Sequence, residues 1–290
     1  MEKTLSLAVL QAAFGEDEEA NIAKVAALVR HAAAQGAKVI LPPELFQGPY
    51  FCVAQDERWF ERARPWKDHP AVKVLAPLAG ELGVVLPISI FERDGPHYYN
   101  SVVLADADGG VLGIYRKSHI PDGPGYQEKY YFRPGDTGFR VWPTRYARLG
   151  VGICWDQWFP EAARAMVLMD AEVLLYPTAI GSEPHDPALD TQARWRRAMQ
   201  GHAVSNVVGI AGANRTGFEP GAGGGQRFYG SSFICDEAGE ILASLGRDEE
   251  GFAHAELELA GLAAKRAAWG FFRDRRPDLY EALVRDRRET

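Results

Sequence analysis

An α/β fold is predicted by three observations on this sequence. Short apolar runs typical of strands alternate with amphipathic helical patterns from one end of the chain to the other. The two kinds of element do not segregate into separate regions, which favours the α/β class. With 290 residues, of which 47% are apolar and 24% charged, the chain is large enough and apolar enough to bury a substantial core.

In the first half of the chain, strands and helices are expected to alternate. Residues 5–11 form an apolar run and predict the first strand. Helical periodicity predicts an amphipathic helix over 21–35 that ends at Gly36. The apolar face of this helix comprises Ile22, Val25, Leu28 and Val29. The other elements expected in this half are a helix at 70–82 and strands at 38–41, 84–91, 101–105 and 111–116.

The second half repeats the strand–helix–strand pattern. Apolar runs and helical spacing predict a strand at 149–154, a helix at 161–169 and a strand at 173–176. A helix at 195–205 is then followed by strands at 207–211, 231–235, 241–245 and 252–257. The turn 236–239 separates two of these strands and ends on a glycine, as short turns between strands often do.

The glycine-rich stretch at 219–226 and the end of the chain have little periodic pattern. The stretch predicts a surface loop, and it lacks the Lys-Ser/Thr pair of a phosphate-binding loop. We therefore do not expect nucleotide binding there. The end of the chain, from about 265 to 290, is rich in arginine, and we expect it to be a tail.

Charge and cysteine content argue against several classes of partner. The formal net charge of −7 disfavours nucleic acid or an anionic membrane as the main partner. No apolar run reaches the roughly 18–20 residues of a membrane span, and the first residues lack the apolar core of a signal peptide. Cys52, Cys154 and Cys235 are widely spaced and odd in number, which fits a reducing compartment. We therefore expect a cytoplasmic protein.

The run from Leu149 to Glu161 contains the strongest candidate for a catalytic residue. An apolar, glycine-spaced strand ends on Cys154, and a helix is expected to begin at Pro160, because proline tolerates the first helical position. Unpaired backbone N–H groups before a helix favour a thiolate and any oxyanion formed beside it. The sequence therefore predicts a nucleophilic cysteine.

Glu44 and Lys117 also lie just beyond the ends of apolar runs, at 39–43 and 111–116. Strand ends in α/β folds commonly converge on a ligand crevice. A carboxylate, an ammonium and a thiol that meet there suit acyl transfer. The glutamate can take the thiol proton, and the lysine can stabilise both the thiolate and the oxyanion.

Each of these residues also has a purely structural interpretation. A lone cysteine on a strand is usually a small buried hydrophobe, and we keep that interpretation for Cys52 and Cys235. Glu44 could complement the dipole of a helix start. Lys117 lies next to Arg116 and could be an ordinary solvated charge.

Three segments around the candidate residues resemble the signature segments of the nitrilase/amidase superfamily. They are Pro43-Glu44-Leu45-Phe46, Tyr115-Arg116-Lys117-Ser118-His119-Ile120-Pro121 and Gly152-Ile153-Cys154-Trp155-Asp156. Their order and wide separation match the Glu–Lys–Cys triad of that superfamily, and the resemblance spans nearly the whole chain. Longer segments at 46–52, 119–126, 154–164 and 176–184 are similar to those of its N-carbamoylputrescine amidases.

The resemblance implies a role for each of four residues. Cys154 would be the nucleophile, Glu44 the general base, and Lys117 the proton donor and oxyanion stabiliser. Members of the superfamily place a second glutamate in the site, and Glu128 matches that position. The alternative for Glu128 is a surface helix carboxylate paired with a nearby lysine. No metal ion and no organic cofactor are implied.

The resemblance also implies an architecture. The superfamily fold is a four-layer α-β-β-α sandwich, often paired through a helix face into dimers and larger assemblies. We therefore expect one carbon-nitrogen hydrolase domain over residues 1–290 and a homo-oligomer. The tail at about 265–290 is expected to pack on a neighbouring subunit.

The reaction implied by the resemblance is hydrolysis of N-carbamoylputrescine to putrescine, ammonia and carbon dioxide through a cysteine thioester. This reaction belongs to polyamine biosynthesis from agmatine. The far end of that substrate is an ammonium, so its pocket should offer an anion or an aromatic face. The substrate-binding residues we expect are Tyr50, Asp122, Tyr126, Trp155 and Glu183. Asp122 and Glu183 could instead cap turns.

Other activities are left open by the same residues. The triad would equally serve an enzyme that acts on β-ureidopropionate, on other N-carbamoyl amines or amino acids, on ω-amides or on nitriles. A carbamoyl amino acid would require a cationic anchor. A zinc amidohydrolase is disfavoured, because the seven histidines show no HxH or HExxH spacing. A papain-like enzyme would use His119 or His202 as its base, and a non-catalytic binding module is the least favoured class.

Overall fold

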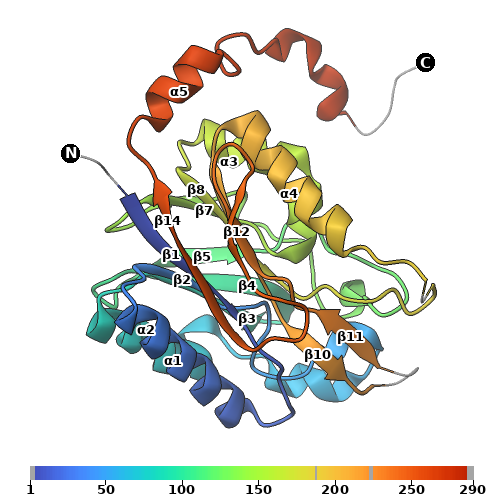
Figure 1. Cartoon of the computed structure of the whole chain (residues 1–290). Coiled ribbons are helices and arrows are strands. Elements are labelled where there is room, and N and C mark those ends of the chain that lie inside the picture. Colours follow the sequence, from blue (N-terminus) through green and yellow to red (C-terminus); the bar gives the residue numbers. More distant parts are fainter. Residues whose placement is uncertain (1–3, 187, 222–224, 286–290) are drawn as a thin grey trace, which may run out of the picture.

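The computed structural model describes residues 4–186, 188–221 and 225–285, which form four layers (Figure 1). Two sheets lie face to face, and helices cover their outer faces. The helices of the first sheet are α1 (Glu18–Ala34) and α2 (Pro70–Leu82), and those of the second are α3 (Pro160–Leu168) and α4 (Gln192–Asn206). The α/β class predicted from the sequence pattern and the α-β-β-α layer order implied by the family resemblance are thus confirmed.

The first sheet is built from two three-stranded parts, ordered β14-β1-β2 and β3-β4-β5. The two parts are joined by backbone hydrogen bonds: Ile40 N–H donates to the Val85 carbonyl at 3.0 Å, and Val85 N–H donates to the Lys38 carbonyl at 2.8 Å. The strands are β1 (Thr4–Gln11), β2 (Val39–Leu41), β3 (Leu86–Asp94), β4 (His97–Ala105), β5 (Val111–Arg116) and β14 (Gly251–Glu258).

The second sheet has the order β13-β12-β9-β8-β7-β6, and β7, β8 and β9 run parallel. Its strands are β6 (Val141–Pro143), β7 (Arg148–Val151), β8 (Val173–Thr178), β9 (Gly209–Asn214), β12 (Phe233–Cys235) and β13 (Ile241–Ser244). The carboxyl ends of parallel strands lie at one edge of a sheet. Cys154, Ala179 and Arg215 follow the ends of β7, β8 and β9, so this edge brings them into one region.

Alternation of side chains along the strands separates the cores. In β4, Val102 and Leu104 belong to the core between the sheets, whereas Val103 and Ala105 belong to the core beneath α1 and α2. A third core lies between the second sheet and helices α3 and α4. This period of two is the pattern of strands buried on both faces.

Most elements lie where the sequence predicts them. The helix at 70–82 and the strand at 111–116 are confirmed with the same bounds. The strand predicted at 149–154 ends earlier, at Val151, because the chain turns into a short 3-10 helix (Cys154–Trp158). The predicted bounds were therefore wrong at the residue that matters most for chemistry.

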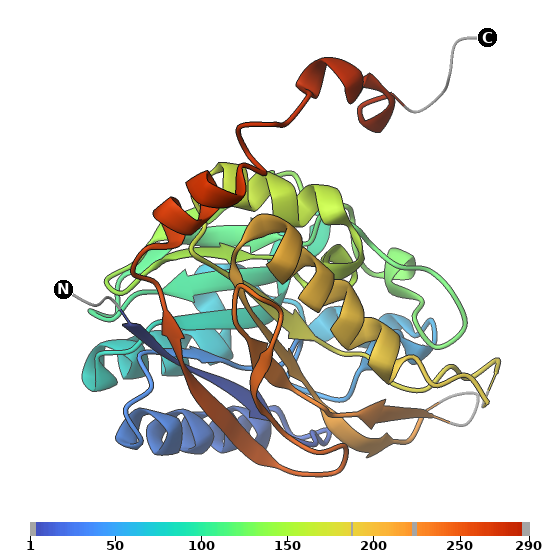
Figure 2. The same ribbon diagram turned by 45° about the horizontal axis from the view of Figure 1, so that its top comes forward.

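Several elements were not predicted, and β6 is one of them. A hairpin of β10 (Thr216–Glu219) and β11 (Gln226–Tyr229) flanks the glycine-rich segment expected to be a loop, of which residues 222–224 lie outside the described structure. Helix α5 (Leu262–Trp269) occupies part of the region expected to be a tail. The chain after α5 contains two short 3-10 turns and projects from the rest of the molecule (Figures 1 and 2).

None of the helices in the described ranges is both long enough and apolar enough to cross a membrane.

Helix α2 begins at a buried histidine. The Nδ1 atom of His69 accepts a hydrogen bond from Ala71 N–H at 3.3 Å, which caps the helix, and the side chain is 1% exposed. Burial, helped by the charge of Arg64, lowers the pKa of His69 to about 3. The folded protein therefore keeps this imidazole neutral, whereas the unfolded chain binds a proton below its ordinary pKa of about 6.5.

We expect His69→Asn to flatten the acid dependence of stability. In the wild type, the unfolded state gains a proton below about pH 6.5, so the contribution of His69 to the unfolding free energy falls by about 1.4 kcal/mol per pH unit towards pH 3. Asparagine also caps helices but does not titrate. Urea unfolding of both proteins at pH 7, 6 and 5 measures the difference. Parallel pH dependences for the two proteins would show that His69 is not the group responsible.

Candidate active site

Lys117, directly after β5, is fully buried between two carboxylates. Its ammonium donates to Oε1 of Glu44 at 2.9 Å and to Oε2 of Glu128 at 2.7 Å. Burial by itself would lower the pKa of Lys117, but the charges of Glu128 and Glu44 outweigh burial and hold the pKa well above its ordinary value. The lysine is therefore a permanent cation near neutral pH and a donor of hydrogen bonds.

Glu44, which follows β2, has one occupied and one free carboxylate oxygen. Oε1 accepts from Lys117 and, at 2.6 Å, from the amide Nδ2 of Asn100 on β4. Oε2 is buried and has no hydrogen-bond partner among the described residues. A buried acceptor without a donor is costly to maintain, and it can take a proton from a nucleophile.

Cys154 lies in a strained turn. Its φ of +41° falls in the left-handed region, which residues other than glycine rarely adopt. The thiol is 4% exposed and donates a long hydrogen bond of 3.7 Å to the carbonyl of Ala179. Burial, followed by the charge of Glu44, raises the pKa of the thiol well above its ordinary value, although the charge of Lys117 acts in the opposite direction. The resting group is therefore a thiol that needs a base.

The Asp156 carboxylate stabilises this turn. It accepts from Ile153 N–H at 2.9 Å, from the Tyr115 hydroxyl at 2.7 Å and from His119 N–H at 3.0 Å. The imidazole Nδ1 of His119 also lies 2.7 Å from this carboxylate, and the ring stacks on Phe159 with centroids 3.7 Å apart. His119 is thus engaged with Asp156, not with the thiol.

The second histidine proposed for a papain-like mechanism is placed elsewhere. Nε2 of His202, on α4, lies 2.9 Å from the carbonyl of Gln157. Burial lowers the pKa of His202. Neither histidine is hydrogen-bonded to Cys154 in the part of the chain that the structure describes, so the arrangement does not favour that mechanism.

Glu128 lies in a short 3-10 turn (Glu128–Tyr130) and is fully buried. Its Oε2 receives the Lys117 ammonium, and its Oε1 accepts from the Tyr50 hydroxyl at 2.7 Å. Burial, together with the nearby charge of Glu44, raises the pKa of Glu128 despite the opposing charge of Lys117. Glu128 is therefore not an exposed surface carboxylate.

A cavity of about 460 Å³ opens above the thiol. Glu128 and Cys154 line it together with four of the substrate-binding residues expected from the sequence, namely Asp122, Tyr126, Trp155 and Glu183. His185 and Arg194 also line it and were not predicted. Burial raises the pKa of Glu183, while the charges of His185 and Arg194 oppose this shift. The cavity thus carries charges of both signs.

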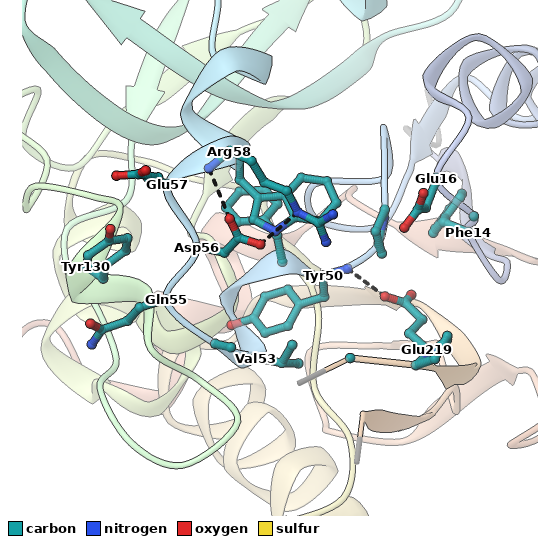
Figure 3. Close-up of a pocket in the computed structure, with 17 residues that line it drawn as sticks. Phe14, Glu16, Tyr50, Val53, Gln55, Asp56, Glu57, Arg58, Tyr130 and Glu219 are labelled. Atoms are coloured by element: carbon teal, nitrogen blue, oxygen red, sulfur yellow. Dashed lines mark hydrogen bonds and ion pairs between the residues drawn. The ribbon is translucent and has the colours of Figure 1, made fainter. Parts of the chain in front are cut away.

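Tyr50 is hydrogen-bonded to Glu128. It lines a different cavity, of about 550 Å³ (Figure 3). The described residues around this second cavity include Glu219 but neither Cys154 nor Lys117. The described part of its wall contains no cysteine, serine or threonine. The Tyr50 hydroxyl thus donates to a carboxylate of the candidate site. Tyr50 is not among the described residues that line the first cavity, and its expected contact with substrate stays a prediction.

Asn100 and Arg194, like His185, are polar residues of the site that were missed in the sequence. Asn100 stands at the start of the apolar half of β4. A polar amide is unusual beside such a run, and this was the sequence signal that could have marked Asn100 as a site residue. Arg194 lies on α4 with no motif around it. Among the described residues, no group of three His, Cys, Asp or Glu side chains is placed to hold a metal ion.

The sequence matches the model of the Carbon-nitrogen hydrolase family over residues 6–267. The chain belongs to the carbon-nitrogen hydrolase family. An N-carbamoylputrescine amidase from Arabidopsis thaliana is 56% identical over 95% of this chain and 93% of its own length. A citrullinase from Francisella tularensis is 50% identical over 97% of this chain and 98% of its own length.

The fold of this carbon-nitrogen hydrolase also matches solved structures. A carbon-nitrogen hydrolase from Helicobacter pylori G27 superposes with a TM-score of 0.92 at 36% sequence identity, over 98% of this chain and 99% of that one. The superfamily recognised in the signature segments is therefore confirmed, and with it an amide-hydrolysing enzyme.

Proposed function

We propose that this carbon-nitrogen hydrolase converts N-carbamoylputrescine to putrescine, ammonia and carbon dioxide. The observation that carries the proposal is the fully buried Lys117 ammonium held by Glu44 and Glu128 beneath the cavity that contains Cys154. The 56% identity to an N-carbamoylputrescine amidase supports this substrate. Cys154 is proposed as the nucleophile, Glu44 as the general base and Lys117 as the stabiliser of the oxyanion.

In the first half of the reaction, the Cys154 thiol attacks the ureido carbon. Its proton passes to Oε2 of Glu44, the carboxylate oxygen that has no other partner. The new oxyanion lies between the Lys117 ammonium and a backbone N–H, for which we propose that of Trp155. Because Lys117 stays protonated, it can supply positive charge where the oxyanion develops.

The tetrahedral intermediate then breaks its bond to the terminal nitrogen. Glu44 returns the proton to that nitrogen, ammonia leaves, and a carbamoyl thioester remains on Cys154. Glu44 next removes a proton from water, and the hydroxide displaces the thiolate, which regains a proton. The product is a carbamic acid, which decomposes to putrescine and carbon dioxide. No metal ion or organic cofactor enters these steps.

The substrate ammonium needs a site at the outer part of the cavity. Glu183 and Asp122 supply carboxylates there, and Tyr126 and Trp155 supply aromatic faces. Glu183 is partly buried, whereas Asp122 is exposed. We therefore assign the main contact with the ammonium to Glu183, since an ion pair is stronger where less water screens it.

A second candidate substrate is a carbamoyl amino acid. Arg194 lines the same cavity and is the kind of cationic anchor that a carboxylate would need. The 50% identity to a citrullinase supports this alternative. Citrulline carries both an ammonium and a carboxylate at the end remote from its ureido group, so it could engage Glu183 and Arg194 together.

We expect ammonia release from N-carbamoylputrescine by the wild type and none by Cys154→Ala. The alanine removes the nucleophile, so no thioester can form. The measurement is ammonia production in the presence of a chelator, with L-citrulline and β-ureidopropionate tested alongside. Turnover that survives Cys154→Ala would overturn the mechanism, and a preference for L-citrulline or β-ureidopropionate would overturn the proposed substrate.

Charge variants at the cavity mouth separate the two substrate classes. We expect Glu183→Gln to raise KM for N-carbamoylputrescine about tenfold, because the variant loses roughly one hydrogen bond between charged groups. KM for β-ureidopropionate should change little. Arg194→Gln should do the reverse. N-propylurea, which has no charge, is the control substrate for both variants. Equal effects on all three compounds would refute a specific role for either charge.

We further propose a cytoplasmic homo-oligomer that acts in polyamine biosynthesis from agmatine. The buried cysteines, all free thiols, support a reducing compartment. The segment that leaves the body after α5 supports assembly, because it exposes apolar side chains that water disfavours. They include Leu279 at 65%, Leu283 at 62% and Val284 at 84% exposure. We propose that this segment packs on a neighbouring subunit and that residues 1–290 form one domain.

Sedimentation velocity tests this assembly. We expect the double variant Leu283→Glu, Val284→Glu to sediment as a smaller species than the wild type, because the charges would oppose burial between subunits. Phe218→Glu is the matched control, since Phe218 on β10 is 53% exposed and lies outside this segment. A wild type that sediments as a monomer would contradict the proposal directly.

A further inference from the structure

We propose that the buried ion pair of Arg215 and Glu219 is a positioning unit that sets both carboxylates around the Lys117 ammonium. The inference rests on the proposed function only in taking Glu44, Lys117 and Cys154 as the reacting groups. The pair comes from the turn between β9 and β10 and from β10 itself, far in sequence from the residues it holds.

Arg215 holds the backbone that carries Glu44. Its guanidinium is fully buried, and its NH2 group donates to the carbonyl of Glu44 at 3.0 Å and to that of Leu45 at 2.9 Å. Its NH1 group donates to the carbonyl of Gly48 at 3.3 Å and to Oε1 of Glu219 at 2.6 Å. The planar guanidinium of Arg215 therefore holds this loop at three backbone carbonyls.

This loop needs an external partner because its backbone is strained. Leu45 has a φ of +47°, in the left-handed region that a leucine rarely adopts. Strained residues persist when surrounding contacts over-determine them. Here the contacts are the Arg215 guanidinium on the carbonyl of Leu45 and the Ser89 hydroxyl, which accepts from Leu45 N–H at 3.0 Å.

Glu219 extends the same unit to the second carboxylate. Its Oε2 accepts from the backbone N–H of Tyr50 at 2.6 Å (Figure 3). The Tyr50 hydroxyl in turn donates to Oε1 of Glu128 at 2.7 Å. The ion pair thus reaches Glu44 through one end of the loop 44–50 and Glu128 through the other. Both glutamates accept from the Lys117 ammonium.

Burial and packing also favour a geometric role. A fully buried ion pair adds little net stability, because the loss of hydration offsets the attraction between the charges. The Arg215 guanidinium is enclosed by the rings of Phe14, Tyr50 and Phe228, at 5.2 to 5.9 Å from their centroids. Neither Arg215 nor Glu219 is among the described residues that line the cavity above Cys154. A positioning role therefore predicts an effect on kcat without an effect on KM.

The test uses Arg215→Ala, Arg215→Lys and Glu219→Gln in the full chain. Lysine keeps the charge but loses the planar fork, and glutamine has one acceptor where Glu219 uses two. Arg266→Ala is the matched control, because Arg266 also donates to two backbone carbonyls, those of Val207 and Ala171, but far from the site. The near-ultraviolet circular dichroism signal gives the fraction of folded protein for each variant, independently of the reactivity of Cys154.

We expect kcat per folded chain to fall on the order of 100-fold in Arg215→Ala and about tenfold in the two conservative variants, the size of loss that misplacing a catalytic group by about 1 Å can cause. KM should stay within about twofold, and Arg266→Ala should match the wild type. A merely structural role would instead lower the melting temperature and the folded fraction while leaving kcat per folded chain unchanged. That result in the folded conservative variants would overturn the proposal.

Alkylation itself gives a readout that needs no substrate. If the pair positions Glu44 as the base for the thiol, iodoacetamide should modify Cys154 about tenfold more slowly in the variants at pH 7, with a smaller difference near pH 10, where hydroxide replaces the base. Rates within about twofold of the wild type in every folded variant would refute the inference. A wild type that is inert towards N-carbamoylputrescine would refute the proposed substrate instead, and the alkylation comparison would still decide the role of the pair.

Discussion

The buried ammonium of Lys117 is the interaction on which the geometry of the site depends. Its two carboxylate partners come from the end of β2 and from a 3-10 turn after β5, and all three side chains are fully buried. Without the ammonium, Glu44 and Glu128 would be two buried negative charges with no cation to balance them. Without the carboxylates, burial would drive the proton off the lysine. Each segment is therefore stable in its position only when the others are present.

Cys154 meets this cluster under a second constraint, the strained turn that the Asp156 carboxylate stabilises. The raised pKa of the thiol means that no thiolate is stored in the resting site. In the proposed mechanism, the free oxygen of Glu44 takes the proton at the moment of attack. This arrangement would differ from a cysteine–histidine pair, in which charge separation precedes substrate binding. Under the proposal, Cys154 stays protonated until a substrate occupies the cavity.

The groups that carry out chemistry and those that would select the substrate lie in different surroundings. The side chains of Glu44, Lys117 and Glu128 are fully buried, so the electrostatic interactions among them are weakly screened. Asp122, Glu183 and Arg194 lie on surface loops and on α4, where water screens their charges. Changes at the mouth can therefore alter which amine or amino acid enters without disturbing the thiol.

The sequence by itself determined the α/β class and most elements, because burial on both faces of a strand and on one face of a helix leaves a periodic pattern. It also marked Glu44, Lys117 and Cys154, since each stands where an apolar strand ends. The layer order came from family resemblance. Periodicity could not supply it, because it says which side of an element is buried but not what covers it.

Only the tertiary structure decided the contacts that cross long distances in sequence. Asn100, Arg215 and Glu219 meet the loop that carries Glu44 through hydrogen bonds between segments that share no local pattern. Tyr50 proved to contact Glu128 from outside the cavity, because its ring direction depends on the packing of that loop against β11. A strand end fixes which residue leaves the sheet. The partners it meets are set by how the two sheets and their connecting loops pack together.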